Sequence, residues 1–446
     1  MAFPEAFTRR TFGHGVHAPE HKDLTRERPI RRFAFAPRLT VPLSQHIGKP
    51  AVPCVRPGQE VGRGEPIALA DGFLSVPIHA PVTGVVEAIR LMPSARGPKT
   101  GAIVIKTYAA DDQQVLYGAP RTIENLAPAE LIQAIQDIGL AGQGGAAFPT
   151  HAKLAAAREH HVETLIVNGC ECEPYQTTDH RLMLEWVDDL IAGIHFALAA
   201  SGARRAIIGV EDNKPDAIDV LRRRLAADAS IAVTAVRTKY PQGSAELLIK
   251  VLLKREVPAG GRSYDVGAVV QNIATLVMLG RLLPPGQGLI ERVVTITGEG
   301  VKQPGNYLVP FGTPLGFVLE QVGFVGDMSR VILGGPMMGT AVSSLDVPVT
   351  KATTAIVVLP VQPATASAPR MYPCIRCGRC VAACPMHLNP SQLGLLAAKR
   401  EYRAMQERFH LDACFECGSC TYVCPAHIPL VQYLRIAKAL NREQAA

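Results

Sequence analysis

The chain has 446 residues, room for about three domains, and this length excludes a single small binding module. The formal net charge is +7, but charged residues make up only 19% of the chain and no basic block is dense enough to favour nucleic acid as a partner. The longest apolar stretches are too short for a bilayer span and no signal peptide opens the chain, so we expect a cytoplasmic protein without a membrane-spanning helix.

Residues 1–40 are rich in arginine and show no periodic pattern of apolar residues. We interpret this segment as an N-terminal arm that extends into solvent, because irregular, charged chain ends seldom pack. The alternative is a docking strip for acidic lipid or for an acidic partner surface.

Short apolar runs separated by glycine and proline fill Val41–Thr107, a pattern typical of an all-β domain with tight turns. The phrases RPGQEVGRGEPIA and HAPVTGVVEAI resemble the two halves of a lipoyl- or biotinyl-type barrel-sandwich domain. Carrier domains of that type modify a lysine in the hairpin between the halves, but the hairpin here, residues 71–74, reads DGFL. Residues 41–120 are therefore expected to form a structural or docking domain without an acceptor lysine.

Helical and strand patterns alternate through residues 121–285. The patterns predict helices at 126–138, from about 150, at 179–201 and at 215–226, and strands at 165–168, 206–210 and 231–236. A β-α-β order with the usual right-handed crossover indicates a Rossmann-like α/β core.

Residues 286–360 change to strands around one short helix, in the phrases RVVTITGEG, PGNYLVPFGTPL, LGFVLEQVG and RVILGGPMMG. These phrases resemble the soluble-ligand-binding β-grasp (SLBB) family. Pro363–Pro369 contains only proline, alanine, threonine and serine, and it predicts a linker into the cysteine domain, for which we take the bounds 361–446. The fold class expected for the whole chain is therefore multidomain α/β.

Eight of the eleven cysteines form two tracts with the pattern C-x2-C-x2-C-x3-C-P. In the bacterial ferredoxin run of this spacing, three close thiolates hold one [4Fe-4S] cluster and the fourth cysteine reaches the other cluster. A zinc site is the alternative, but zinc sites use paired C-x2-C motifs and have no role for a third cysteine two residues on. Residues 393–409, between the tracts, predict a helix, so we expect a double [4Fe-4S] helical ferredoxin-like domain. The pattern assigns one cluster to Cys374, Cys377, Cys380 and Cys424 and the other to Cys414, Cys417, Cys420 and Cys384.

Gly142–Ala147 formally matches the dinucleotide fingerprint G-x-G-x-x-A. The true fingerprint follows a strand, however, and this loop follows a predicted helix. Its glycines still allow backbone N–H groups to approach a phosphate or a flat ring, and the next helix points its positive end at the loop.

Four segments, GQGGAAFPTHAK, VNGCECEPYQTTD, TKYPQG and VVQNIAT, occur in the order of the FMN- and NADH-binding fold. That fold belongs to the flavoprotein subunit of respiratory complex I and to the C subunit of the Rnf electron-transport complex. With the barrel-sandwich domain in front, and the β-grasp unit and two cysteine tracts behind, the whole chain resembles the family of Rnf C subunits. The resemblance implies that FMN and NADH are bound by Gly142, Gly144, Gly145, Phe148, Lys153, Asn168, Glu171, Glu173, Tyr175, Tyr240, Gln242, Gly243, Asn272 and Thr275.

Two positions depart from the family pattern. Relatives commonly read YPQGGE where this chain reads YPQGSAE, so the acid Glu246 stands one residue late. The other departure is Cys170, which stands beside Cys172 in a C-x-C flanked by acids. Acidic neighbours disfavour thiolates, so we interpret these two cysteines as buried structural thiols.

The resemblance implies an NADH dehydrogenase-type oxidoreductase subunit of an ion-translocating complex. Hydride would pass from NADH to noncovalent FMN, which then delivers single electrons to the two clusters, because a cluster accepts one electron at a time. The implied partners are membrane subunits and a ferredoxin-like iron-sulfur subunit, with ferredoxin or flavodoxin as the eventual acceptor and a peripheral position on the cytoplasmic side of the membrane. The alternatives are a flavin and iron-sulfur cobalamin reductase, or a non-catalytic electron-wire or scaffold subunit.

Overall fold

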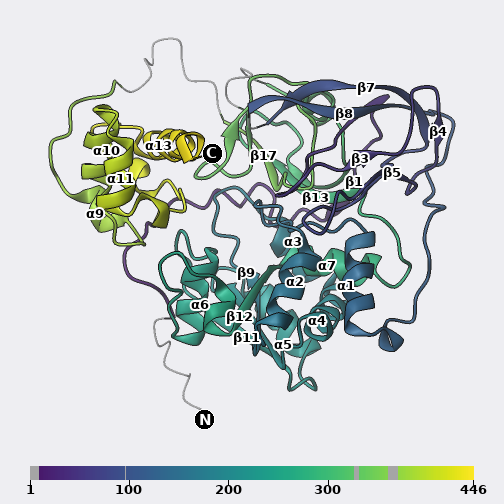
Figure 1. Ribbon diagram of the computed structural model, residues 1–446, viewed down its shortest axis with the longest axis horizontal. Helices are drawn as coiled ribbons and strands as arrows, with labels where there is room; N and C mark the ends of the chain where they lie inside the picture. Colours follow the sequence, from purple (N-terminus) through teal and green to yellow (C-terminus); the bar gives the residue numbers. More distant parts are fainter. Residues whose placement is uncertain (1–9, 96, 326–330, 360–369, 446) are drawn as a thin grey trace.

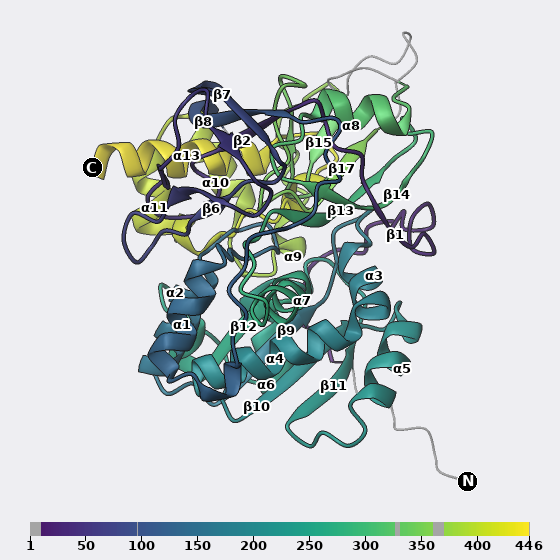
Figure 2. The same cartoon turned by 90° about the vertical axis from the view of Figure 1, so that its right-hand side faces the viewer.

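The structure is a computed structural model that describes residues 10–95, 97–325, 331–359 and 370–445. Four bodies of secondary structure follow one another in the chain: an N-terminal β domain, an α/β core, a β-grasp unit and a helical cysteine domain. In Figure 1 the two β-rich parts lie above the core, and the helices of the cysteine domain lie to one side. The turned view in Figure 2 keeps the β-rich parts above the core. Among the described helices, none has the length and apolar character needed to cross a bilayer.

The N-terminal β domain contains two small sheets whose apolar side chains face each other. Leu39 and Val41 on one strand and Ile103 and Ile105 on its neighbour are fully buried in the core of this domain. The hairpin at 71–74 contacts the core, since His151 lies 2.7 Å from the carbonyl oxygen of Phe73. The first sheet is β2 (Arg38–Pro42), β8 (Gly97–Thr107), β7 (Gly84–Ser94) and β4 (Glu60–Val61), and the second is β3 (Val52–Pro53), β5 (Pro66–Leu69) and β6 (Ile78–His79).

The α/β core is built on a parallel sheet with helices on both faces. Leu165 and Val167 point to one face, while Ile166 points to the other and packs with Leu248. The strands, in spatial order, are β11 (Ile231–Val236), β10 (Arg205–Glu211), β9 (Thr164–Gly169) and β12 (Ala268–Asn272). The helices are α1 (Pro128–Asp137), α2 (Thr150–Glu159), α3 (Thr178–Glu185), α4 (Val187–Ser201), α5 (Pro215–Arg224), α6 (Ala245–Leu253) and α7 (Ile273–Leu282).

Two helices predicted as continuous are broken in the structure. The helix expected over 179–201 is interrupted at Trp186, whose backbone is not helical, and α4 beyond it packs closely on α7. A Cβ added at Gly193 would lie only 1.8 Å from the carbonyl oxygen of Leu276, so the new direction of α4 serves this tight crossing. The helix expected over 393–409 is likewise broken, because Arg400 has a positive φ of 60°.

The β-grasp unit is a six-stranded sheet around α8 (Leu315–Val322), and its first strand comes from the N-terminal arm. The prediction of a solvated arm is therefore wrong for the described part of that segment. Thr25 is fully buried and Phe33 is 4% exposed, because the arm crosses between the domains and pairs with the sheet. The predicted linker Pro363–Pro369 lies outside the described residues. The strands are β1 (Ile30–Arg32), β14 (Gly305–Pro310), β13 (Glu291–Thr297), β17 (Ala355–Val358), β15 (Val331–Leu333) and β16 (Thr340–Ala341).

The cysteine domain places each tract before a short helix. Gly378 and Gly418 occupy matched positions with φ of 72° and 79°, a conformation that favours glycine, and a short helix begins directly after each. The longer helices pack behind the two cysteine loops through Leu393, Met405 and Leu434. The helices are α9 (Arg379–Ala383), α10 (Pro390–Ala398), α11 (Tyr402–Phe409), α12 (Ser419–Tyr422) and α13 (Leu430–Ala445).

Candidate functional site

A cavity of about 370 Å³ lies where the α/β core meets the β-grasp unit and the cysteine domain. We call it the core cavity. It is found at the carboxyl ends of β9 and β12, the edge where open parallel sheets bind their ligands. Seven of the predicted cofactor-binding residues line it: Gly144, Asn168, Glu171, Glu173, Tyr240, Gly243 and Asn272.

The other seven predicted residues are not among the side chains that line the core cavity. The hydroxyl of Thr275 accepts a hydrogen bond from the Gln143 backbone at 2.9 Å and so supports the glycine loop from behind. The Tyr175 hydroxyl donates to Glu299 at 3.1 Å, and its ring stacks on His21 at 4.7 Å. The remaining five are Gly142, Gly145, Phe148, Lys153 and Gln242.

The glycine loop, residues 142–147, is held at Gln143 by buried polar contacts. The guanidinium of Arg292, only 1% exposed, donates to the carbonyl oxygen of Gln143 at 2.9 Å. Gly144 is exposed toward the cavity, and a Cβ there would lie 3.2 Å from the Cβ of Asn272. The loop therefore presents bare backbone to the cavity in a fixed position.

Asn272 is the N-cap of α7 and connects that helix to an acid. Its side-chain oxygen accepts from the backbone of Ala274 at 2.9 Å, and its amide nitrogen donates to Asp179 at 2.6 Å. Burial, and then the charge of Glu171, raise the pKa of Asp179 above its ordinary value. The positive end of α7 and a carboxyl group with a raised pKa thus face the same cavity.

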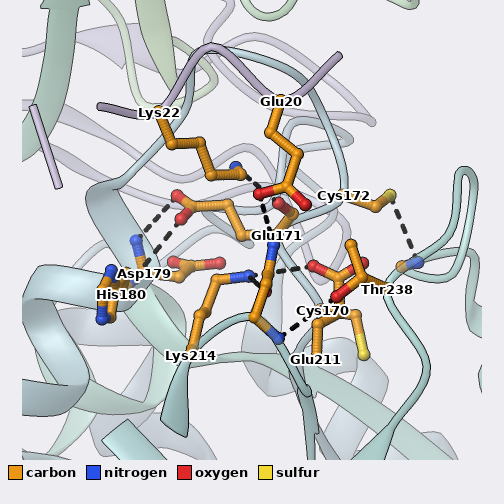
Figure 3. A network of polar contacts seen from close by, with 12 residues as sticks. Glu20, Lys22, Cys170, Glu171, Cys172, Asp179, His180, Glu211, Lys214 and Thr238 are labelled. Atoms are coloured by element: carbon orange, nitrogen blue, oxygen red, sulfur yellow. Dashed lines mark hydrogen bonds and ion pairs between the residues drawn. The ribbon is translucent and has the colours of Figure 1, made fainter. Parts of the chain in front are cut away.

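Glu171 binds the start of α3 rather than pointing freely into the cavity. Its carboxylate accepts from the backbone of Asp179 at 2.9 Å and of His180 at 3.4 Å, as Figure 3 shows. Lys22, from the arm, donates to the carbonyl oxygens of Glu171 at 2.8 Å and Glu173 at 3.0 Å. The ammonium group of this buried lysine therefore fixes the backbone between Glu171 and Glu173.

Glu173 contacts the β-grasp unit across the cavity wall. Its carboxylate accepts from the backbone of Met338 at 2.8 Å and of Met337 at 3.2 Å. Burial raises the pKa of Glu173 from 4.5 to about 7 in spite of these hydrogen bonds. A Cβ at Gly335 would lie 2.1 Å from this carboxylate, so the turn approaches it closely only because residue 335 is glycine.

The segment with the displaced acid also reaches the core cavity. Ser244, Ala245 and Glu246 all line it, and α6 begins at Ala245, so Glu246 lies in the first helical turn. Burial lowers the pKa of Lys153 to about 8, and the negative charge of Glu246 opposes that decrease. The one-residue shift therefore keeps the acid at the cavity and near a lysine.

Cys170 is buried, as expected for a structural thiol, whereas Cys172 is only partly buried. Burial, reinforced by the charge of Glu211, raises the pKa of both thiols well above the ordinary value. Both side chains therefore stay protonated at neutral pH.

Several residues at the core cavity were missed by sequence reasoning. Asp179 ends the motif VNGCECEPYQTTD, and Arg292 is the lone cation in the strand ERVVTIT, so both carried a usable signal. Met338 and Phe415 come from domains remote in sequence, and no local pattern marks them. Lys22 belongs to the arm that was interpreted as solvated.

The eight tract cysteines line two separate cavities. The first-tract site, about 260 Å³, is lined by Cys374, Cys377, Cys380 and Cys424. The second-tract site, about 20 Å³, is lined by Cys384, Cys414, Cys417 and Cys420. Each site therefore combines three cysteines of one tract with the last cysteine of the other. Within the described chain, no three side chains of His, Cys, Asp or Glu are close enough to hold a single metal ion, whereas a [4Fe-4S] cluster is held by four cysteines spread around it.

Burial raises the pKa of Cys414 to about 11 and that of Cys420 to about 12. These thiols are therefore protonated unless a positive centre is bound. Iron binding to such sites deprotonates the thiols and releases protons.

Comparison with protein families divides the chain as its domains suggest. Residues 10–110 match the RnfC barrel sandwich hybrid domain, and residues 135–281 match the Nuo51 FMN-binding domain. Residues 293–341 match the SLBB domain, and residues 373–428 match a 4Fe-4S dicluster domain. These matches confirm the predicted fold class and the predicted cofactors, FMN and two [4Fe-4S] clusters.

Curated relatives are similar over nearly the whole chain. The C subunit of the proton-translocating ferredoxin:NAD(+) oxidoreductase complex of Clostridium ljungdahlii is 41% identical over 97% of this chain and 94% of its own length. The C subunit of the Na(+)-translocating ferredoxin:NAD(+) oxidoreductase complex of Acetobacterium woodii is 37% identical over 85% of this chain and 86% of its own length. The C subunit of the ion-translocating oxidoreductase complex of Pectobacterium carotovorum is 41% identical over 96% of this chain, but only 57% of that longer protein is covered.

A solved structure shares the fold at low sequence identity. It is an NAD+-reducing [NiFe]-hydrogenase in the air-oxidized state, 20% identical, with a TM-score of 0.50 over 72% of this chain and 67% of that chain. This likeness concerns the fold alone.

Proposed function

The chain belongs to the RnfC family, the C subunits of ion-translocating oxidoreductase complexes, and from this membership we propose that it is the NADH-oxidising electron-input subunit of such a complex. The family membership predicted from sequence is confirmed, as is the coarser function of an oxidoreductase subunit in an ion-translocating complex. The direction of electron flow, from NADH through FMN and the clusters to partner subunits, is the finer proposal.

The core cavity fits FMN on geometric grounds. Gly144 leaves its backbone uncovered at the cavity wall, where a side chain would crowd Asn272. Asn272 opens α7, a helix of ten residues whose positive end favours an anionic phosphate group. Bound FMN supplies the exchange between hydride and single electrons that NADH and iron-sulfur clusters cannot perform directly.

The residues of this chain bind and orient rather than transfer protons. Arg292 and Thr275 fix the glycine loop through Gln143, so the loop does not need to reorganise when a ligand binds. Burial raises the pKa of Glu173 to about 7 and raises that of Asp179 as well, so the two acids repel the phosphates of NADH less than two full carboxylates would. Direct hydride transfer between the nicotinamide and flavin rings would need no general base, and we therefore assign that role to no side chain.

We assign the clusters as the tract spacing predicts, one at the first-tract site and one at the second-tract site. The carrying observation is that each cavity is lined by three cysteines of one tract and one of the other. Exposed Met371, Tyr372 and Ile375 surround the first-tract site, so we propose that electrons leave there toward a partner iron-sulfur subunit. Ferredoxin or flavodoxin is the proposed final acceptor, and the proposed location is peripheral, on the cytoplasmic side of the membrane.

The scaffold alternative depended on decay of the flavin site through the displaced acid. Glu246 lines the core cavity despite its shift, which favours a functional site. The order of the domains, with the barrel sandwich in front, matches the RnfC relatives and disfavours the cobalamin reductase alternative.

The test is made on the full chain purified without oxygen. We expect about one FMN and about eight iron atoms per chain, and oxidation of NADH when ferricyanide is the acceptor. Cobalamin reduction by the pure protein would instead favour the reductase. A folded protein that holds both clusters but takes up neither FMN nor NADH after reconstitution would establish the scaffold.

A further inference from the structure

One side chain spans the wall between the core cavity and the second-tract site. Tyr240 lines the cavity, is 3% exposed, and donates its hydroxyl proton to the backbone carbonyl oxygen of Cys417 at 2.6 Å. Cys417 is one of the four cysteines of the second-tract site. Phe415, from the same loop, lines the core cavity directly. The second tract therefore forms part of the wall of the cavity proposed for flavin.

The backbone of Tyr240 is held by the N-terminal arm. Val16 and Tyr240 form an antiparallel bridge with two N–H to O=C hydrogen bonds of 2.9 Å. The preceding arm residue, Gly15, donates its backbone N–H to the carbonyl oxygen of Ala383 at 3.1 Å. The ring of His14 lies 3.1 Å from the carbonyl oxygen of Cys384. The arm thus joins Tyr240 to the end of the first tract.

These contacts converge on one site, although they reach it from two tracts. Cys384 ends the first tract and Cys417 belongs to the second, yet both line the second-tract site. Tyr240 contacts one of these loops and the arm contacts the other. We call Tyr240 together with His14, Gly15 and Val16 the clamp.

The clamp depends on glycine at position 15. Its φ is +76°, and a Cβ there would lie 2.6 Å from the carbonyl oxygen of Tyr240 and 2.8 Å from the ring of Phe12. Phe12 is itself buried, and Lys239 donates to its carbonyl oxygen at 3.0 Å. Gly13, two residues earlier, has an open surrounding with nothing within 4 Å of its Cβ position. A side chain at residue 15 would therefore displace the arm from Tyr240, whereas one at residue 13 would not.

We propose that the clamp positions the second-tract cluster against the flavin, which makes this cluster the immediate electron acceptor. This inference rests on the proposed function for the location of the cofactors. In each step the reduced flavin loses one electron and the oxidised cluster gains it, and NADH supplies the electron pair. Tunnelling rates fall steeply with distance, so a loop released from the clamp slows this transfer. Hydrogen bonds around cluster ligands also tune the reduction potential, so Tyr240 has a second measurable effect.

The first experiment compares Gly15→Val with the matched control Gly13→Val, both in the full chain with its cofactors. Rapid mixing with NADH separates bleaching of the flavin from reduction of the second-tract cluster. We expect Gly15→Val to keep the rate of flavin bleaching and to slow cluster reduction by about tenfold or more, with Gly13→Val like the unaltered protein. Equal cluster reduction in the two variants overturns the clamp.

Tyr240→Phe keeps the proposal testable where Gly15→Val fails to fold, because it removes only the hydroxyl group. Potentiometric titration followed by electron paramagnetic resonance reports each cluster and needs no NADH. We expect the signal and potential of the second-tract cluster to shift while those of the first-tract cluster stay unchanged. An unchanged second-tract cluster overturns the positioning role of Tyr240. If NADH failed to bleach the flavin of the unaltered protein, the proposed function would be refuted instead. The titration would still test the clamp, because it needs no NADH.

Discussion

The two cysteine tracts have the same spacing and the same local backbone, yet they differ in exposure and in the parts of the chain that contact them. The first-tract site is open, at about 260 Å³, and Cys377 is exposed beside the apolar side chains of Met371 and Ile375. The second-tract site is smaller, at about 20 Å³, none of its cysteines is exposed, and the β-grasp unit contacts its loop, where a Cβ on Gly418 would lie 2.8 Å from the Met337 carbonyl oxygen. One sequence pattern thus yields an exposed site and an enclosed one.

This difference shows that a ligand motif determines which cofactor is bound, while the packing around it determines its place in an electron path. An exposed cluster suits exchange with another protein, and an enclosed one beside a flavin cavity suits internal transfer. The predictions below test whether the two sites differ in this way, beginning with the largest expected effect.

Cys384→Ser is expected to remove the second-tract cluster although Cys384 belongs to the first tract. The reason is that Cys384 lines the cavity formed by Cys414, Cys417 and Cys420. We expect iron to fall from about eight to about four atoms per chain, with the loss of one resonance signal. The matched variant Cys424→Ser should remove the other signal.

If Cys384→Ser instead removed the cluster of the first tract, each tract would bind its own cluster without exchange. Both variants should retain FMN, since neither residue lines the core cavity.

Gly144→Val is expected to abolish flavin binding while both clusters remain. The valine would crowd Asn272, 3.2 Å from the Cβ position, and fill the face of the glycine loop. We expect no bound FMN and no NADH oxidation, with an unchanged iron content. The control Gly316→Val places the same side chain on α8, where the Cβ position has only an ordinary contact with Leu345 at 3.6 Å.

Full retention of flavin in Gly144→Val would mean that FMN does not lie over this loop. In that case the enclosure of the second-tract site would have no link to flavin chemistry.

The carboxyl group of Glu173 should make stability depend on pH at the wall between the cavity and the β-grasp unit. Its pKa is raised from 4.5 to about 7 in the folded chain, so the folded state binds more protons than the unfolded state between these values. Stability should therefore fall as pH rises from about 5 to about 8, at most by about 3 kcal/mol from this group. Glu173→Gln should lose that dependence, as measured by denaturant unfolding across this range. Parallel curves for the two proteins would contradict the raised pKa.

Much of the fold and of the cysteine sites was predictable from the sequence, because these features depend on residues that are close together in the chain. The cysteine spacing, the glycine loop and short apolar strands such as Leu165–Val167 depend on neighbours within a few residues. The break at Trp186 was not predictable, because it follows from the close crossing of α4 on α7. The two halves of the broken helix read as one amphipathic pattern.

The path of the arm was the larger failure, and its cause is also nonlocal. Lys22 reads as a solvated cation, but three backbone carbonyl oxygens of the segment 171–176 bind its ammonium group. Likewise, Tyr240 was expected to line the flavin pocket, but no motif indicates that its hydroxyl reaches Cys417. Contacts between domains leave little trace in one sequence when the residues involved are also common at surfaces.

The smallest expected effect is a difference in how fast the two clusters lose iron to a chelator. Cys377 is exposed at the first-tract site, whereas none of the four cysteines of the second-tract site is exposed, and the arm and the β-grasp unit contact the loops that hold them. A chelator reaches exposed iron without any opening of the fold, while the enclosed site needs local unfolding first. We therefore expect iron to leave the first-tract site about ten times faster than the second-tract site. The decay of each resonance signal measures the two rates. Cys424→Ser, which keeps only the second-tract cluster, should show the slow phase alone. Equal rates at both sites would mean that the packing around the second-tract site does not protect its cluster. The structure would then give no physical reason to assign one cluster to exchange with a partner and the other to internal transfer.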